Sequence, residues 1–219
     1  MPPRFASAMP LAAVGAAAAV VCGVAVALRR RRRSNDPPQW YEELFVAAER
    51  LRIAEWENGA LWRRWNGWVG NDYAHGPNAG CRIAGYALSG AGVGTTLVGA
   101  AFFGPNAESH KGLCHGGSMC AVMDDVIGWV GFCVSGTCVP WCGFTVQVNT
   151  SLQSPVAVGS WLRVEGTITA VERRKVRVKS TLVNPASGVV HCSAEGLFIL
   201  NKTSVEASPA AQRPLSNKS

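Results

Sequence analysis

The chain has 219 residues, of which 48% are hydrophobic, enough for one globular domain with appended segments. Six of its 21 basic residues are arginines within residues 1–35, which hold no acid, so +6 of the net charge of +7 lies there. The other 15 basic and 14 acidic residues leave +1 for residues 36–219, a nearly neutral body without the basic face of a nucleic-acid binder, so we expect no nucleic-acid partner.

An uncharged apolar segment, residues 9–28, lies directly before five consecutive arginines. At about 1.5 Å of rise per residue, a helix of this length would cross a hydrocarbon core of about 30 Å. The arginines on its C-terminal side predict a single-pass membrane anchor, with the domain in the cytosol. Because the first 35 residues are rich in alanine and arginine and free of acid, a mitochondrial presequence is the alternative.

A helix-start pattern follows at Asp36, Pro37 and Gln39, which fit an N-cap, a first-turn proline and the third position of a capping box. We therefore expect one or two amphipathic helices over 37–69 that dock on the core. Their apolar positions recur at three- and four-residue spacing: Trp40, Leu44, Ala48 and Leu51.

From residue 80 the chain becomes a series of short segments rich in β-branched and aromatic residues. The first two predict a hairpin, a polar loop and one long apolar helix come next, and alternating segments then predict further strands. In chain order we expect strands over 81–88 and 92–103, a loop over 104–114, a helix over 116–132, and strands over 144–152, 160–171, 174–183 and 188–200.

Alternation along these later strands predicts which side chains face the core. Phe144, Val146 and Val148 are expected to face inward, opposite Thr145, Gln147 and Asn149. An antiparallel sheet that is polar on one side needs a cover for its apolar side. Since the helix over 116–132 is apolar nearly all round, the sheet should curve around it. The tail over 201–219 has little to bury, and we expect it to be disordered.

Asp124 and Asp125 lie within this apolar helix, where a carboxylate is costly unless it is hydrogen-bonded, protonated or facing a polar cleft. Adjacent helical residues point about 100° apart, so at most one of them faces a given site. A solvated stripe would explain both residues, but the apolar neighbours leave little room for one. We therefore interpret one of them as a functional acid with a perturbed pKa.

Gly116 and Gly117 start the helix, where unpaired backbone N–H groups at the positive end of the dipole can receive a developing oxyanion. His115, beside them, is a candidate substrate contact, although a loop or capping role is common for such a histidine. Gly116 and Asp124 are separated by about 12 Å of helical rise, too far to act on one carbonyl. A two-fold dimer with antiparallel helices would bring Gly116 of one chain to Asp124 of the other.

The run HGGSMCAVMDDVIG resembles the helix signature of hotdog-fold acyl-CoA thioesterases, and the strand section from Thr145 resembles the branch of thioesterase superfamily member 4. The resemblance covers about residues 80–200. It implies that Asp124 is the general base or nucleophile and that the Gly116 N–H, with Gly117 beside it, polarises the thioester carbonyl. It also implies that Thr145 positions water or substrate.

The resemblance further implies an α+β hotdog fold, in which a curved antiparallel sheet wraps around one long central helix, here preceded by N-terminal helices and the membrane anchor. The substrate would be a long- or medium-chain fatty acyl-CoA, the assembly a homodimer or a dimer of dimers, and no metal or cofactor would be needed. The chain is then divided into four parts: the anchor (1–35), a helical linker region (36–79), the thioesterase domain (80–200) and the tail (201–219).

Four basic residues are candidates for binding the CoA phosphates, and ordinary solvated surface charge explains them equally well. The candidates are Lys111, Arg173, Arg174 and Lys175. Two other functions stay open: a non-catalytic acyl-binding protein, and a hotdog hydratase or dehydratase, which would want a free catalytic histidine.

The eight cysteines lie largely in apolar runs, which indicates reduced, structural thiols. Cys138 and Cys142 are separated by three residues, unlike common redox or zinc pairs, and we interpret them as structural too.

Overall fold

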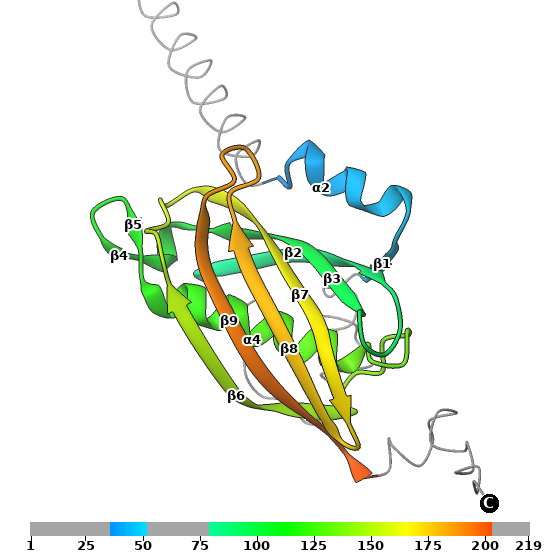
Figure 1. Ribbon diagram of the computed structural model, residues 1–219. Helices are drawn as coiled ribbons and strands as arrows, with labels where there is room; N and C mark the ends of the chain where they lie inside the picture. Colours follow the sequence, from blue (N-terminus) through cyan, green and yellow to red (C-terminus); the bar gives the residue numbers. More distant parts are fainter. Residues whose placement is uncertain (1–35, 52–78, 203–219) are drawn as a thin grey trace, which may run out of the picture. The chain divides into compact units, whose positions relative to one another are not determined.

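The computed structural model describes residues 36–51 and 79–202, and the chain divides into two units, residues 1–36 and 37–219. The second unit contains a seven-stranded antiparallel sheet in the order β1-β2-β3-β7-β8-β9-β6, and a two-stranded sheet, β4-β5 (Figure 1). The strands are β1 (Glu49–Leu51), β2 (Cys81–Ser89), β3 (Thr96–Phe103), β4 (Glu108–His110), β5 (Leu113–Cys114), β6 (Gly143–Leu152), β7 (Ser160–Glu172), β8 (Lys175–Val183) and β9 (Val190–Leu200).

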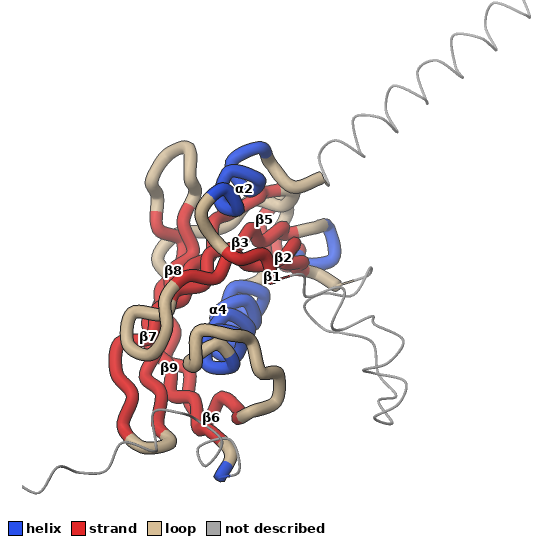
Figure 2. The backbone as a smooth tube through the Cα atoms, turned by 90° about the vertical axis from the view of Figure 1, so that its right-hand side faces the viewer, coloured by secondary structure: helices blue, strands red, loops and turns tan. Residues whose placement is uncertain are grey.

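Helix α4, Gly116–Phe132, is the central element, and the sheet curves around it (Figure 2). It begins where His115 caps it and ends at Cys133. Its side chains supply much of the buried core, so the predicted hotdog arrangement of one long helix within a curved antiparallel sheet is confirmed. The predicted bounds of this helix, 116–132, agree with the structure.

A row of small residues lets α4 approach the sheet closely. Gly166 of β7, Ser180 of β8 and Ala194 of β9 are register partners across three adjacent strands, and all three are buried. A Cβ on Gly166 would come within 2.9 Å of a methyl carbon of Val126 on the helix. The Ser180 hydroxyl is satisfied by the sulfur of Met123, also on α4, at 3.4 Å. The row therefore forms a shallow seat in which the helix rests directly on the backbone of the sheet.

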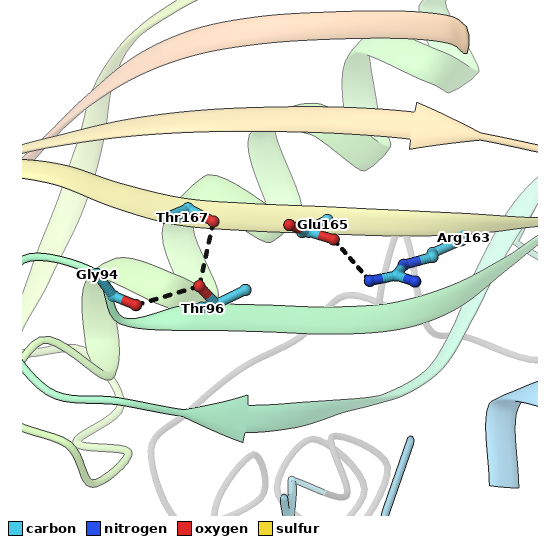
Figure 3. Close-up of polar contacts among 5 residues, drawn as sticks. All are labelled: Gly94, Thr96, Arg163, Glu165 and Thr167. Atoms are coloured by element: carbon cyan, nitrogen blue, oxygen red, sulfur yellow. Dashed lines mark hydrogen bonds and ion pairs between the residues drawn. The ribbon is translucent and has the colours of Figure 1, made fainter. Parts of the chain in front are cut away.

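The outer face of the sheet is polar, as the alternation in β7 predicts. Arg163 and Glu165 form an ion pair at 2.8 Å on this face (Figure 3). The hydroxyls of Thr96 and Thr167 lie 3.2 Å apart between β3 and β7. Leu162, Val164 and Ile168, on the other side of β7, are buried as predicted. On β8, Val176 and Val178 are likewise buried and Arg177 and Lys179 are exposed.

The prediction of long amphipathic helices before the sheet is wrong for residues 37–51, the part of that region that the structure describes. Helix α2 spans only Gln39–Glu43, a short 3-10 helix covers Leu44–Val46, and Glu49–Leu51 forms strand β1. Pro38 takes the N-cap position without any side-chain hydrogen bond, so Asp36 does not cap the helix. Pairing with β2 competes successfully for residues 49–51, because a sheet edge satisfies their backbone groups.

Strand β6 also departs from its predicted alternation. Phe144 and Val146 are 56% and 48% exposed, whereas Thr145 faces α4. The register with β9 slips between Thr145 and Gln147, so Val146 is the extra residue of a β-bulge. The bulge reverses the parity of the strand, since Thr145 before it and Val148 after it both lie on the inner side. Simple period-two reading cannot detect such an insertion.

Several predicted segments lie outside the described residues. These are the apolar run 9–28, most of the expected helical region, including residues 52–69, and nearly all of the tail after residue 202. Among the helices that the structure does describe, none has the length and apolar character to traverse a bilayer.

Candidate active site

The two adjacent aspartates of α4 have different surroundings, as their angular separation requires. Asp125 points toward β2, where the hydroxyl of the fully buried Tyr86 donates a hydrogen bond to its Oδ2 at 2.8 Å. This hydrogen bond offsets the free-energy cost of removing part of the Asp125 carboxylate from water. Burial, followed by the nearby Asp125 charge, raises the pKa of Tyr86, so its hydroxyl stays protonated as a donor. Asp125 is therefore a structural acid.

Asp124 lies on a different face of the helix and is exposed in the single protomer. Its surroundings still reduce its hydration, because desolvation raises the pKa of its carboxyl, with a smaller raising effect from Asp125. A hydrogen bond from the Thr145 side chain acts in the opposite direction and lowers that pKa. The net shift is upward, which makes Asp124 a stronger base than an ordinary aspartate when it is ionised.

The contact between Asp124 and Thr145 depends on the bulge in β6 and on a glycine in α4. Gly128 is one helical turn after Asp124 on the same face. A Cβ on Gly128 would lie 3.5 Å from the Thr145 Oγ1, so the hydroxyl sits directly against this part of the helix. The bulge at Val146 turns the hydroxyl toward the helix, and the missing side chain of Gly128 leaves space beside it.

The two glycines at the N-terminus of α4 differ in the hydrogen bonding of their N–H groups. The Gly117 N–H donates to the Nδ1 of His115 at 2.8 Å, so this pair is a helix cap. That bond occupies both groups, and neither is free for substrate in this arrangement. Within residues 36–51 and 79–202, the N–H of Gly116 has no hydrogen-bond acceptor. Gly116 thus offers the donor that an oxyanion would require.

Strand β6 connects these two locations along one edge of the domain. Its Thr145 end lies beside Asp124 and Gly128, and its Leu152 end lies beside Gly116, where a Cβ would come within 2.7 Å of the Leu152 side chain. Within one protomer the acid and the N–H donor are thus at opposite ends of the strand. In the described part of the chain β6 pairs only with β9, which leaves its other edge open.

The basic candidates for CoA phosphates are split between the two ends of α4. Lys111 is exposed in the β4-β5 turn, close to the start of the helix. Arg173 and Lys175 are exposed at the β7-β8 turn, whose neighbour Leu200 pairs with the first residue of β6. Arg174 in this turn donates from Nε to the Leu200 carbonyl at 2.7 Å, which gives it a structural role.

Sequence reasoning did not identify Tyr86, Gly128 or Leu152 as parts of this region. Tyr86 is 39 residues from the carboxylate it satisfies, and no local pattern signals such a contact. Gly128 interrupts the apolar run of α4, and that interruption was the available signal for a close approach. Among the described residues, no group of three or more histidine, cysteine, aspartate or glutamate side chains is arranged to hold a metal ion.

Comparisons with known proteins find a family model that matches part of the chain and several similar solved structures. Residues 111–190 match the family model of the thioesterase superfamily, and the comparison with curated proteins gave no match. Among solved structures, zebrafish thioesterase superfamily member 2 is similar at 17% identity, with 53% of this chain and 81% of that chain covered and a TM-score of 0.45.

Two further solved structures are similar to this chain. A hypothetical thioesterase of Streptococcus pneumoniae, solved with coenzyme A, has 18% identity over 53% of this chain and 85% of its own, with a TM-score of 0.45. Another thioesterase superfamily protein has 22% identity over 88% and 81%, with a TM-score of 0.47. The family match confirms the resemblance in the helix motif: residues 111–190, which include Gly116, Asp124 and Thr145, are similar to the thioesterase superfamily.

Proposed function

We propose that the protein is an acyl-CoA thioesterase, which hydrolyses a long- or medium-chain fatty acyl-CoA to the free acid and CoA at sites shared by two protomers. The observation that carries the proposal is the position of the Thr145 hydroxyl against the Asp124–Gly128 face of α4, on the open side of the domain, with the Gly116 N–H at the other end of the same strand. All three residues lie in the segment that matches the thioesterase superfamily.

The proposed reaction begins when the Asp124 carboxylate removes a proton from water, while the Thr145 hydroxyl fixes the carboxylate by its hydrogen bond. The water oxygen adds to the thioester carbonyl carbon, and the carbonyl oxygen takes up the negative charge. The N–H of Gly116 from the partner protomer, at the positive end of α4, stabilises that charge. Collapse re-forms the carbonyl and breaks the carbon–sulfur bond, and the CoA thiolate recovers the proton from Asp124.

A second copy of the chain is the proposed occupant of the open β6 edge. Phe144, Val146 and Leu152 on this strand are exposed apolar side chains of the kind that a dimer interface covers. Antiparallel pairing of two β6 strands about a two-fold axis near Val148 would place Thr145 of one chain opposite Leu152 of the other. Because Leu152 adjoins Gly116, this pairing would bring Asp124 to the partner's N–H donor.

A proline substitution tests the role of the backbone donor. Gly116 is the first residue of α4, a position that accepts proline, and His115 before it has φ −64° and ψ 135°, which suits a residue before proline. Gly116→Pro removes the N–H and should lower kcat about 10²- to 10³-fold. The control Gly116→Ala adds a Cβ beside Leu152 as proline does but keeps the N–H. Equal activity of the two variants would refute the donor role.

Mixing two inactive variants tests whether the site is shared. A heterodimer of Asp124→Asn and Gly116→Pro chains contains one site with both groups intact and one with both lost. Random mixing should therefore restore about a quarter of the wild-type activity, because about half of the dimers are mixed and each has one working site of two. If mixing restores nothing while native mass spectrometry confirms the mixed dimers, the backbone donor does not come from the partner protomer.

A thiol-release assay distinguishes the thioesterase from an acyl-binding protein and from a hydratase or dehydratase. The full chain is incubated with acyl-CoAs of graded length, and the released thiol is measured. Release of CoA that depends on Asp124 supports the thioesterase, whereas saturable binding without release supports an acyl-binding protein. A change in enoyl absorbance without thiol release supports a hydratase or dehydratase.

We also propose that residues 9–28 anchor the protein in a membrane with the domain on the cytosolic side. The supporting observation is the uncharged run followed by five arginines. Membrane fractionation with protease protection should find the full chain in membranes and a chain starting at Ser34 released from them. Import into mitochondria with loss of the N-terminal segment would support the presequence instead.

A further inference from the structure

The loop between α4 and β6 gathers three cysteines at one end of the core. Cys133 follows the last residue of α4, Cys142 comes just before β6, and Cys138 lies between them. The chain turns back on itself here, since the Val139 N–H donates to the Phe132 carbonyl at 2.9 Å and the Gly136 N–H donates to the Cys133 carbonyl at 2.9 Å. These bonds hold Cys138 beside Cys133.

The side chains of Cys133 and Cys138 lie close enough to influence each other's ionisation, and both are free thiols. They differ in their access to solvent, because Cys133 is fully buried whereas Cys138 is partly exposed. Cys142 is also buried, and the effect of Cys138 on it is the electrostatic effect of the Cys138 charge. The arrangement thus has one thiol that a small solute can reach and one thiol placed directly behind it.

The electrostatics agree with this division. The hydrogen bond from Cys133 lowers the pKa of Cys138, although desolvation and the nearby Glu49 carboxylate oppose that shift. The same hydrogen bond, followed by desolvation, raises the pKa of Cys133. Cys138 is therefore the sulfur that ionises more readily, and an ionised, accessible sulfur is the one that oxidants attack.

We propose that Cys138 and Cys133 form a peroxide-reactive thiol pair, with Cys138 as the attacking sulfur and Cys133 as the resolving one. The Cys138 thiolate attacks one oxygen of a hydroperoxide, which breaks the O–O bond, gives a sulfenic acid and releases hydroxide, or alkoxide from an organic hydroperoxide. The Cys133 sulfur then attacks the Cys138 sulfur, loses its proton and expels water. Two thiols are oxidised to one disulfide, and the peroxide is reduced.

Peptide mapping of the full chain tests this pair without reference to the proposed thioesterase activity. Reduced protein is treated with equimolar hydrogen peroxide, free thiols are alkylated, and the chain is cut with chymotrypsin. Cleavage after Phe132 and Trp141 gives a peptide 133–141 with both Cys133 and Cys138 but not Cys142. We expect this peptide to be unalkylated and two hydrogens lighter, and we expect dithiothreitol to reverse the change.

Variants then separate the two roles. Cys138→Ser should abolish the reaction, whereas Cys133→Ser should leave a Cys138 sulfenic acid that dimedone traps. The control Cys120→Ser removes another partly exposed thiol, on α4, and should leave the 133–141 disulfide unchanged. A fully alkylated 133–141 peptide from treated wild-type protein would overturn the proposal. A disulfide from Cys138 to Cys142, or sulfinic acid in place of the disulfide, would also overturn it.

Discussion

Tyr86→Phe removes one hydroxyl from a fully buried side chain and leaves its ring in place. The lost group donates to Asp125 Oδ2 at 2.8 Å, and a hydrogen bond to a charged acceptor contributes about 1.5–3 kcal/mol. Asp125 is half-buried and has a further interaction, so we expect the lower part of that range, about 1.5–2 kcal/mol. For a domain of this size, the loss lowers Tm by about 3–8 °C.

Urea unfolding of the full chain, followed by tryptophan fluorescence, measures the loss, and a double-mutant cycle assigns it to the pair. In an Asp125→Ala background the tyrosine hydroxyl has lost this acceptor, so Tyr86→Phe should cost little or even stabilise the fold. The cycle should therefore give a coupling energy of about 1–2 kcal/mol. Equal losses in both backgrounds would show that the hydroxyl does not stabilise the carboxylate.

Three further predictions concern the acid and the packing of α4. Thr145→Val removes a hydrogen bond that lowers the pKa of Asp124, so the acid limb of the pH profile of kcat/KM should move to higher pH, whereas Thr145→Ser should leave it in place. Because the pKa of Asp124 is raised by folding, its ionised form costs stability above that pKa, and this cost disappears as the pH falls toward the unfolded value of about 3.9. Asp124→Asn should thus unfold at equal or higher urea than wild type at pH 7, with the difference shrinking in acid, and a clear loss at pH 7 would contradict the raised pKa. Gly131→Ala places a Cβ 2.5 Å from the Phe198 ring and should cost about 1 kcal/mol after its gain in helix propensity, whereas Gly128→Ala, with its nearest atom at 3.5 Å, should be neutral or stabilising in the same unfolding assay.

The helix and the central strands could be predicted because their signals are local. The glycine pair and the apolar run after it predict both ends of helix α4. In β7 and β8, inward and outward side chains alternate without interruption over 162–168 and 176–179, as the sequence predicts. Strand β1 could not be predicted, since residues 49–51 have no strand pattern and take their conformation from pairing with β2. Tertiary pairing outweighs helical propensity there.

The candidate site was predictable in its residue types but not in its contacts. Asp124 and Asp125 are indistinguishable in the sequence, and only the long-range hydrogen bond from Tyr86 makes one of them structural. Thr145 was assigned by resemblance, while the alternation of its own strand predicted that it faces away from the helix. The assignments of Gly116, Asp124 and Thr145 to catalysis remain predictions for the variants above to test.

The bulge at Val146 determines how β6 would respond to the deletion of one residue. Deleting that single residue would leave Thr145 and Val148 two positions apart, so both would keep their inward faces in an uninterrupted pleat. Keeping the residue but straightening the strand would instead put Val146 opposite Phe198, in the place that Thr145 holds now, and would turn the Thr145 hydroxyl to solvent. The strand could thus lose its extra residue and still keep a hydrogen-bond donor beside the acid, whereas losing the bulge alone would replace that donor with an apolar side chain.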